Sequence, residues 1–208
     1  MLTVHAADVV HGAPVGADAV AVDGGTIAAI GPYEDLLADR PRARVRRWSG
    51  LITPGLLNAG APALLEAAYH PDPREADELG TEPITGAALV ALDLDEARWG
   101  ASARRGLQRM LRHGTTAVRG PFTRPAVRTA VARSGLRVHA PGPAAQPVGL
   151  DPLACVAEPD EVFVAALAVG GPADLAVFGV RDPAELRTAG AGSCTATVLG
   201  GRLVFRRG

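Results

Sequence analysis

The sequence predicts a mixed α/β fold in which a segment of alternating helices and strands interrupts a β-rich region. Short apolar segments separated by glycine turns occur near both ends of the chain. Between them, an amphipathic helix followed by glycine and an apolar strand occurs twice, an order typical of a parallel sheet. We therefore expect one domain made of residues 1–55 plus 162–208, and an inserted lobe made of residues 56–161.

The first 55 residues are expected to form short strands joined by turns. Asp23-Gly24-Gly25 supplies a tight turn between two of these strands, since glycine tolerates a positive φ. A short helix is expected at Tyr33–Asp39, and the apolar run Leu51–Leu57 predicts entry into a strand buried on both faces. The expected strands are Leu2–Val4, Asp8–Val10, Ala17–Val22, Thr26–Ile30 and Ala43–Trp48.

Residues 93–113 form the strongest predicted helix. Their apolar side chains recur at helical spacing, and arginines occupy the opposite side. Gly114 ends this helix, and Thr115–Val118 follows as a buried strand. A second amphipathic helix at Thr123–Ser134 ends at a glycine and leads to a further buried strand at Leu136–His139.

Two segments are expected to be loops or irregular helices. Residues 66–85 are acidic and broken by prolines, and residues 140–160 are rich in proline and glycine. Strands then return, and Gly200-Gly201 supplies a last hairpin turn. The expected strands of this part are Val162–Val169, Asp174–Phe178, Ala196–Leu199 and Arg202–Phe205.

Composition and charge exclude several classes of protein. Of 208 residues, 48% are hydrophobic and 21% charged, which is typical of a soluble globular protein. The apolar runs are too short to span a bilayer, and no secretory signal opens the chain, so we expect a cytoplasmic protein that binds no membrane. A net charge of −1 argues against nucleic acid as a partner. The arginine-rich run 40–47 is interpreted as a solvated connection rather than a binding patch.

Particular residues then indicate a family. The chain resembles the amidohydrolase superfamily, nearest to its imidazolonepropionase and aminodeoxyfutalosine deaminase-like branch. The segments that carry the resemblance, in the order of the family, are Asp23–Pro32, Gly50–Asn58, Met110–Val118, Ser134–Val138, Gly171–Phe178 and Val198–Val204. The resemblance implies a composite β-sandwich built from both chain ends and an inserted (β/α) barrel, which here is truncated. It also implies a hydrolase acting on non-peptide C–N bonds.

The metal ligands that the resemblance leads us to expect are missing. Members of the family usually have N-x-H-x-H at the end of the first barrel strand, where two histidines on one side of the strand bind the metal. In this chain Asn58 matches the asparagine, but Gly60 and Pro62 occupy the two histidine positions. Neither side chain has a donor atom, so we expect no metal there.

The chain is also too short between its β-rich parts for a complete barrel. A (β/α)₈ barrel takes about 250 residues, whereas only some hundred lie between Asn58 and Val162. That length suits about three βα units. The later strands, which in the family supply two more histidines and an aspartate, have no counterpart.

Two histidines remain as weak candidates for a catalytic role. His139 follows a predicted buried strand, where a barrel places its chemistry, although a hydrogen-bonded structural histidine is the favoured interpretation. His70 lies among carboxylates, so His70, Asp72 and Glu75 form an alternative metal site for zinc or iron. Acidic loops are usually only solvated, and the two cysteines of the chain have no metal-like spacing.

The sequence thus favours a non-catalytic or highly divergent relative with a structural, binding or regulatory role and without a cofactor. A homodimer or a partner chain is expected to cover the incomplete barrel. The alternative is a hydrolase or deaminase acting on a small cyclic C–N substrate, with a relocated metal site or a site completed by a partner subunit. A third hypothesis is a binder of a small cyclic nitrogenous ligand in a pocket near Asn58 and His139.

Overall fold

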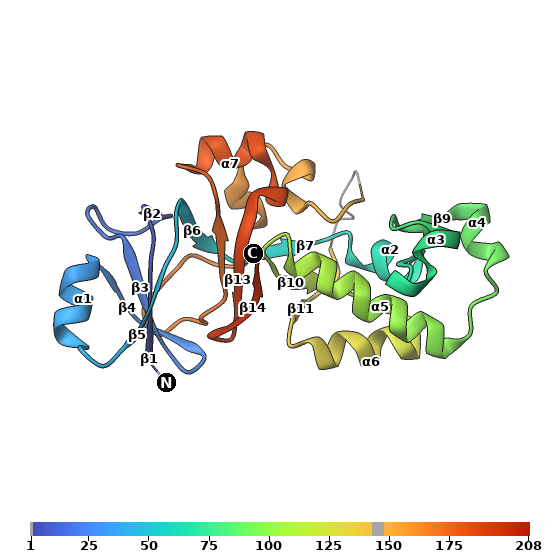
Figure 1. Ribbon diagram of the computed structural model, residues 1–208, viewed down its shortest axis with the longest axis horizontal. Coiled ribbons are helices and arrows are strands. Elements are labelled where there is room, and N and C mark those ends of the chain that lie inside the picture. The colour runs from blue at the N-terminus through green and yellow to red at the C-terminus, as the bar shows by residue number, and fades with distance from the viewer. Residues whose placement is uncertain (1, 143–147) are drawn as a thin grey trace.

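The computed structural model describes residues 2–142 and 148–208, which form a mixed α/β protein with several sheets. Figure 1 shows that segments from both chain ends lie together at one side of the molecule, while the helices of the middle segment extend to the other side. The mixed α/β class predicted from the sequence is confirmed. The domain boundaries at residues 55 and 162 stay a prediction.

The first sheet, sheet A, is formed by the N-terminal segment. Its strand order is β4-β3-β1-β5, with β1 and β5 parallel and the other neighbours antiparallel. Helix α1 (Tyr33–Asp39) covers one face, where Tyr33 and Leu36 pack on Val4 and Ala21. The strands are β1 (Leu2–Ala6), β3 (Ala19–Asp23), β4 (Thr26–Gly31) and β5 (Arg44–Arg47).

The second sheet, sheet B, joins residues from both ends of the chain. Its order is β14-β13-β12-β6-β2, so that the C-terminal β12 pairs with the N-terminal β6. Helix α7 (Pro183–Ala189) and two 3₁₀ turns lie on the face opposite sheet A, where Leu186 and Val162 pack on Phe178. The strands are β2 (Val9–Val10), β6 (Leu51–Pro54), β12 (Leu175–Phe178), β13 (Cys194–Leu199) and β14 (Arg202–Arg206).

Sheets A and B share a hydrophobic core. Alternate residues of β3 point to opposite faces, so that Val20 and Val22 enter this core while Ala21 contacts the α1 side. From sheet B, Ile52 and Val177 enter the same core. Strand β3 is therefore buried on both faces, since each face of sheet A packs against a different element.

The middle segment forms a parallel sheet of order β11-β10-β7. Helix α5 connects β7 to β10, and helix α6 connects β10 to β11, as in successive βα units. Within the described residues this sheet has three strands and does not close into a barrel. The bounds are β7 (Leu56–Asn58), α5 (Glu96–Leu111), β10 (Thr115–Arg119), α6 (Pro125–Ser134) and β11 (Arg137–His139).

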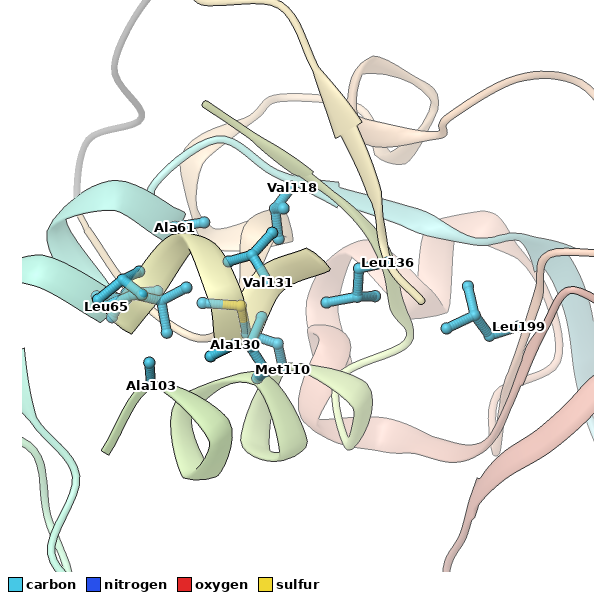
Figure 2. Packing of buried hydrophobic residues seen from close by; sticks show 12 residues of the cluster. Ala61, Leu65, Ala103, Met110, Val118, Ala130, Val131, Leu136 and Leu199 are labelled. Atoms are coloured by element: carbon cyan, nitrogen blue, oxygen red, sulfur yellow. The ribbon is translucent and has the colours of Figure 1, made fainter. Parts of the chain in front are cut away.

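A separate core holds α5 and α6 against the parallel sheet. Figure 2 shows Met110 of α5, Ala130 and Val131 of α6, and Val118 of β10 in one cluster. Leu199 of β13 also belongs to this cluster, so sheet B contacts the inserted segment directly. The two strongest predicted helices thus form because their apolar stripes face each other.

The segment between β7 and α5 contains only short elements, as its prolines and acidic residues predict. It crosses the end of α5 (Figure 1) and includes the two-stranded sheet β8-β9. The bounds are α2 (Ala61–Glu66), β8 (Ala68–Tyr69), η1 (Pro73–Glu75), α3 (Ala76–Leu79), β9 (Ile84–Thr85) and α4 (Gly86–Ala91).

Gly55 is the point where the chain passes from sheet B to the parallel sheet. It separates β6 from β7, and its N–H donates to Asp174 O at 2.9 Å. A Cβ atom at this position would overlap the side chain of Thr116 on β10. Glycine is therefore required here, because the Thr116 side chain occupies the space that a Cβ atom would need.

Two strand predictions need correction. The segment Val162–Val169 forms no strand: it follows 3₁₀ turn η3 (Pro159–Val162) irregularly, with one isolated bridge from Phe163 to Leu56. In sheet B, β6 already pairs with β12 on one side and with β2 on the other, so no further strand can pair with it there. The strand at 137–139 exists but lies at an edge, and Val138 is 56% exposed rather than buried.

The remaining short elements lie near the C-terminus. The helix at Pro183–Ala189, capped by the Asp182 side chain, was not predicted. Two further 3₁₀ turns, η2 (Pro152–Cys155) and η4 (Ala191–Ser193), complete the structure. None of the helices in the described ranges is long and apolar enough to cross a membrane.

Candidate functional site

The carboxyl ends of the three parallel strands lie at one edge, which is where open α/β sheets bind ligands. The register pairs Asn58 of β7 with Val118 of β10, and the next residue, Arg119, with His139 of β11. Asn58, Arg119 and His139 thus end three neighbouring strands. The structure brings together the two residues of the pocket predicted from the sequence, Asn58 and His139, at a common edge.

Asn58 is buried, and both ends of its amide are occupied. Its Oδ1 accepts a hydrogen bond from Gly60 N at 2.9 Å, and its Nδ2 donates to Gly149 O at 3.0 Å. The side chain therefore holds the turn that leads from β7 into α2 and ties this turn to the chain near residue 149. In this arrangement Asn58 has a structural role.

Gly60 and Pro62 lie at the start of helix α2. Gly60 is the residue before the helix, and Pro62 lies in its first turn, where a missing N–H costs nothing. A Cβ atom at Gly60 would lie 3.4 Å from Asn58 Oδ1 and 3.5 Å from a methyl group of Val148. The two positions where the family has histidines are thus part of a helix start and present no donor side chain.

His139 lies on the edge strand β11 and is partly exposed. Its backbone oxygen accepts a hydrogen bond from Gly120 N at 3.1 Å. Among the residues that the structure describes, its imidazole has neither a hydrogen-bond nor an ion-pair partner. The ring is therefore available to a ligand at the sheet edge.

Arg119 is a residue of this edge that the sequence did not point to. Its Nε is buried and has no partner among the residues described, and its guanidinium passes close to Gly142. An arginine that follows the apolar run Thr115–Val118 is usually taken as the solvated end of a strand, so the sequence pattern gave no sign of its burial.

His70 lies away from the strand ends, against helix α5. It is buried, its backbone N–H donates to Ser102 Oγ at 2.8 Å, and its Nε2 donates to Leu64 O at 2.9 Å. Gly106 of α5 leaves room for the ring. Burial lowers the pKa of His70, and the nearby Arg109 and Arg105 lower it further, although the bond to Leu64 O opposes this shift.

Asp72 and Glu75 contact arginines rather than His70. Asp72 accepts hydrogen bonds from Arg105 Nη1 at 3.2 Å and from a backbone N–H. Glu75 accepts from Tyr69 Oη at 2.6 Å and from Arg98 Nη2 at 3.0 Å. The Tyr69 hydrogen bond is the main cause that lowers the pKa of Glu75, with the Asp72 N–H and Arg98 adding to it.

These contacts bear on the alternative metal site at His70, Asp72 and Glu75. The imidazole Nε2 is occupied by a carbonyl, and both carboxylates are neutralised by guanidinium groups. Across residues 2–142 and 148–208, no group of three or more His, Cys, Asp or Glu side chains is arranged to hold a metal ion.

The N-terminal hairpin is similar to a known protein family. Residues 19–39 match the family model of the imidazolonepropionase-like composite domain of bacteria. The resemblance is confirmed. The matched residues are β3, β4 and α1, the part of sheet A that carries the first of the segments recognised in the sequence.

Solved structures that match part of this chain include ochratoxinase from A. niger, at 20% identity and a TM-score of 0.43 over 67% of this chain and 30% of that one. Guanine deaminase from E. coli has 17% identity and a TM-score of 0.45, over 67% of this chain and 36% of that one. Adenosine deaminase from Xanthomonas campestris has 23% identity and a TM-score of 0.43, over 65% of this chain and 32% of that one.

The chain therefore spans about a third of the length of these solved structures. No curated protein sequence matches it significantly.

Proposed function

We propose that this amidohydrolase-like chain is a divergent relative without metal-dependent hydrolysis, with a structural, binding or regulatory role. The observation that supports the proposal most directly is the helix start at Gly60 and Pro62. Hydrolysis of the family type needs a metal that acidifies a water molecule and a base that takes its proton. Glycine and proline at the two histidine positions offer no ligand for such a metal.

The architecture fits this interpretation. Sheets A and B share one core and combine strands from both chain ends, as expected of a composite β-sandwich. The parallel strands β7, β10 and β11, with α5 and α6 between them, correspond in this interpretation to the start of a (β/α) barrel. The protein would then be a pseudoenzyme that keeps the framework and not the metal centre.

The test is metal analysis of the purified chain after equilibration with zinc, iron or manganese, together with assays on guanine and adenosine. We expect substoichiometric metal and no turnover. Stoichiometric metal together with turnover would contradict the proposal and favour a hydrolase or deaminase with a relocated or partner-completed site. The variants His70→Ala and His139→Ala would then locate that site, because only His139 lies at the carboxyl ends of the parallel sheet, whereas His70 follows β8 of the two-stranded sheet.

Binding without hydrolysis is the second candidate function, and His139 favours it. Its unpartnered imidazole lies on the same edge as the buried, unpaired Arg119 Nε. A small cyclic nitrogenous ligand offers both acceptors and donors to such groups. Thermal shift with purines and imidazole derivatives tests this candidate: stabilisation that disappears in His139→Ala supports it, and no stabilisation by any of them removes it.

We expect the protein to act as a homodimer or in complex with a partner chain. Strand β11 is an edge of the parallel sheet, and Val138 on it is exposed. An exposed strand edge with an apolar side chain is a site for pairing with another chain. A second copy of this chain would cover this edge.

A further inference from the structure

A cavity of about 350 Å³ lies between helix α5 and the segment 70–82. It is separate from the strand ends that carry Asn58 and His139, and its walls come from α5 on one side and from η1, α3 and the following loop on the other. Figure 1 shows these short elements beside α5. The size is within the range of small-molecule sites in proteins, which begins at about 300 Å³.

Three arginines line this cavity: Arg105 and Arg109 from one face of α5, and Arg112 from the residue that follows the helix. Arg105, Arg109 and Arg112 are spaced by four and three residues, which places their side chains in a row along the helix. Gln108 lies on the same face and adds an amide. The wall is therefore rich in N–H donors arranged over two turns of helix.

Arg105 is held in a fixed orientation. Its Nε donates to His70 O at 2.8 Å, and its Nη1 donates to Asp72 Oδ2 at 3.2 Å. Its side chain is mostly buried. A guanidinium that is already ordered loses little conformational entropy when it donates hydrogen bonds to a further partner.

The other two arginines are less well neutralised. Arg109 donates to Thr81 O at 2.8 Å, but its ion pair with Glu82 is long, at 3.5 Å, and the Glu82 side chain is 84% exposed. The guanidinium of Arg112 has no ion-pair or hydrogen-bond partner in the part of the chain that the structure describes, and only its backbone N–H is bonded, to Arg109 O at 3.1 Å. Three guanidinium groups thus face two carboxylates, Asp72 and Glu82, which leaves an excess of positive charge.

We propose that this cavity binds a small oxyanion, a phosphate or carboxylate group, through Arg109 and Arg112, with Arg105 forming the rigid end of the site. Guanidinium groups match the geometry of such anions and form two parallel hydrogen bonds with them. The ring of His70 forms part of the wall. The inference does not depend on the loss of hydrolysis proposed above.

Isothermal titration calorimetry at low ionic strength tests the proposal, with inorganic phosphate and succinate as the two probes. We expect saturable binding of at least one probe, and the probe that binds identifies the anion class. Sodium chloride at equal ionic strength gives the background. Arg112→Gln is expected to weaken binding about tenfold, because it removes one charged hydrogen-bond donor from an exposed position.

The matched control is Arg104→Gln. Arg104 is exposed on the same helix but does not line the cavity, so this variant makes the same change of charge and should bind the anion as the wild type does. Equal weakening by both substitutions would mean a diffuse electrostatic effect and would overturn the proposal. Absence of saturable binding by both probes in the wild type would overturn it as well.

Discussion

At the scale of single residues, His5 is a histidine that the fold keeps neutral. It is buried in strand β1, and Trp48 Nε1 donates to its Nδ1 at 3.2 Å, with the two rings stacked. Burial lowers the pKa of His5 from 6.5 to about 4, and the positive charge of Arg46 adds to this effect. Protonation would place a charge in a buried site and would also remove the acceptor of the Trp48 hydrogen bond.

The unfolded chain takes up a proton at this histidine near pH 6.5, whereas the folded chain does so only near pH 4. Between these values the unfolded state binds more protons, so the free energy of unfolding falls as the pH falls. We expect His5 to lower it by about 2 kcal/mol between about pH 7.5 and about pH 5. Urea unfolding followed by circular dichroism at both pH values measures this change.

His5→Gln is the variant that separates this effect from others, since glutamine keeps an acceptor but does not titrate. Its stability should depend less on pH than that of the wild type. Part of the dependence should remain, because burial also lowers the pKa of His70. An unchanged dependence in His5→Gln would show that His5 is not the source.

The residues of the sheet edge could be predicted from the sequence in part. Asn58 was found because it matches the asparagine of the family's N-x-H-x-H run, and His139 was found because it ends a predicted strand. Arg119 was missed because the local pattern does not reveal that its Nε is buried while the residue as a whole stays partly exposed. The burial of His70 was missed because it depends on Gly106 and Ser102, which are more than 30 residues away along the chain.

At the scale of elements, helix α5 positions the segment that carries His70. A Cβ atom at Gly106 would lie 2.7 Å from both His70 Nε2 and a methyl group of Leu65, and both side chains are buried. We expect Gly106→Ala to lower the free energy of unfolding by about 1–2 kcal/mol, because overpacking exceeds the gain in helix propensity. Chemical unfolding measures this difference.

Gly100 on the same helix is the control for this substitution. A Cβ atom there meets its nearest neighbour, Ala126 Cβ, at 3.5 Å, an ordinary contact. Gly100→Ala should therefore keep the stability or raise it by about 1 kcal/mol. Equal effects of the two substitutions would contradict the close packing of α5 against His70.

An element could be predicted from the sequence when it packs against a single surface. Helices α5 and α6 were predicted nearly to their bounds because each buries a continuous apolar stripe. The strand predicted at Val162–Val169 was wrong because its apolar side chains do not share one environment. Val162 packs on sheet B, Leu167 packs in the core between the sheets, and Val169 is exposed. An apolar run alone does not reveal such a division.

At the scale of the whole molecule, the exposed edge of β11 predicts assembly. Light scattering of the purified chain should give a mass about twice 21.3 kDa, since a second copy would cover the edge. Val138→Asp should shift the protein to the monomer. Val90→Asp is the control, because Val90 is even more exposed but lies on α4, away from the sheet edge. A wild-type monomer would remove the prediction.

The pairing of β6 with β12 also sets an order of events during synthesis. Residues 51–54 leave the ribosome more than 120 residues before their partners at 175–178. The helices and strands of the middle segment are complete in sequence by residue 139, and domains generally fold as their residues emerge. Until residues 175–178 emerge, Ile52 of β6 lacks its core neighbour Val177, and the face of sheet A that packs on sheet B is incompletely covered, so a chaperone that protects apolar β-strands would act in that interval.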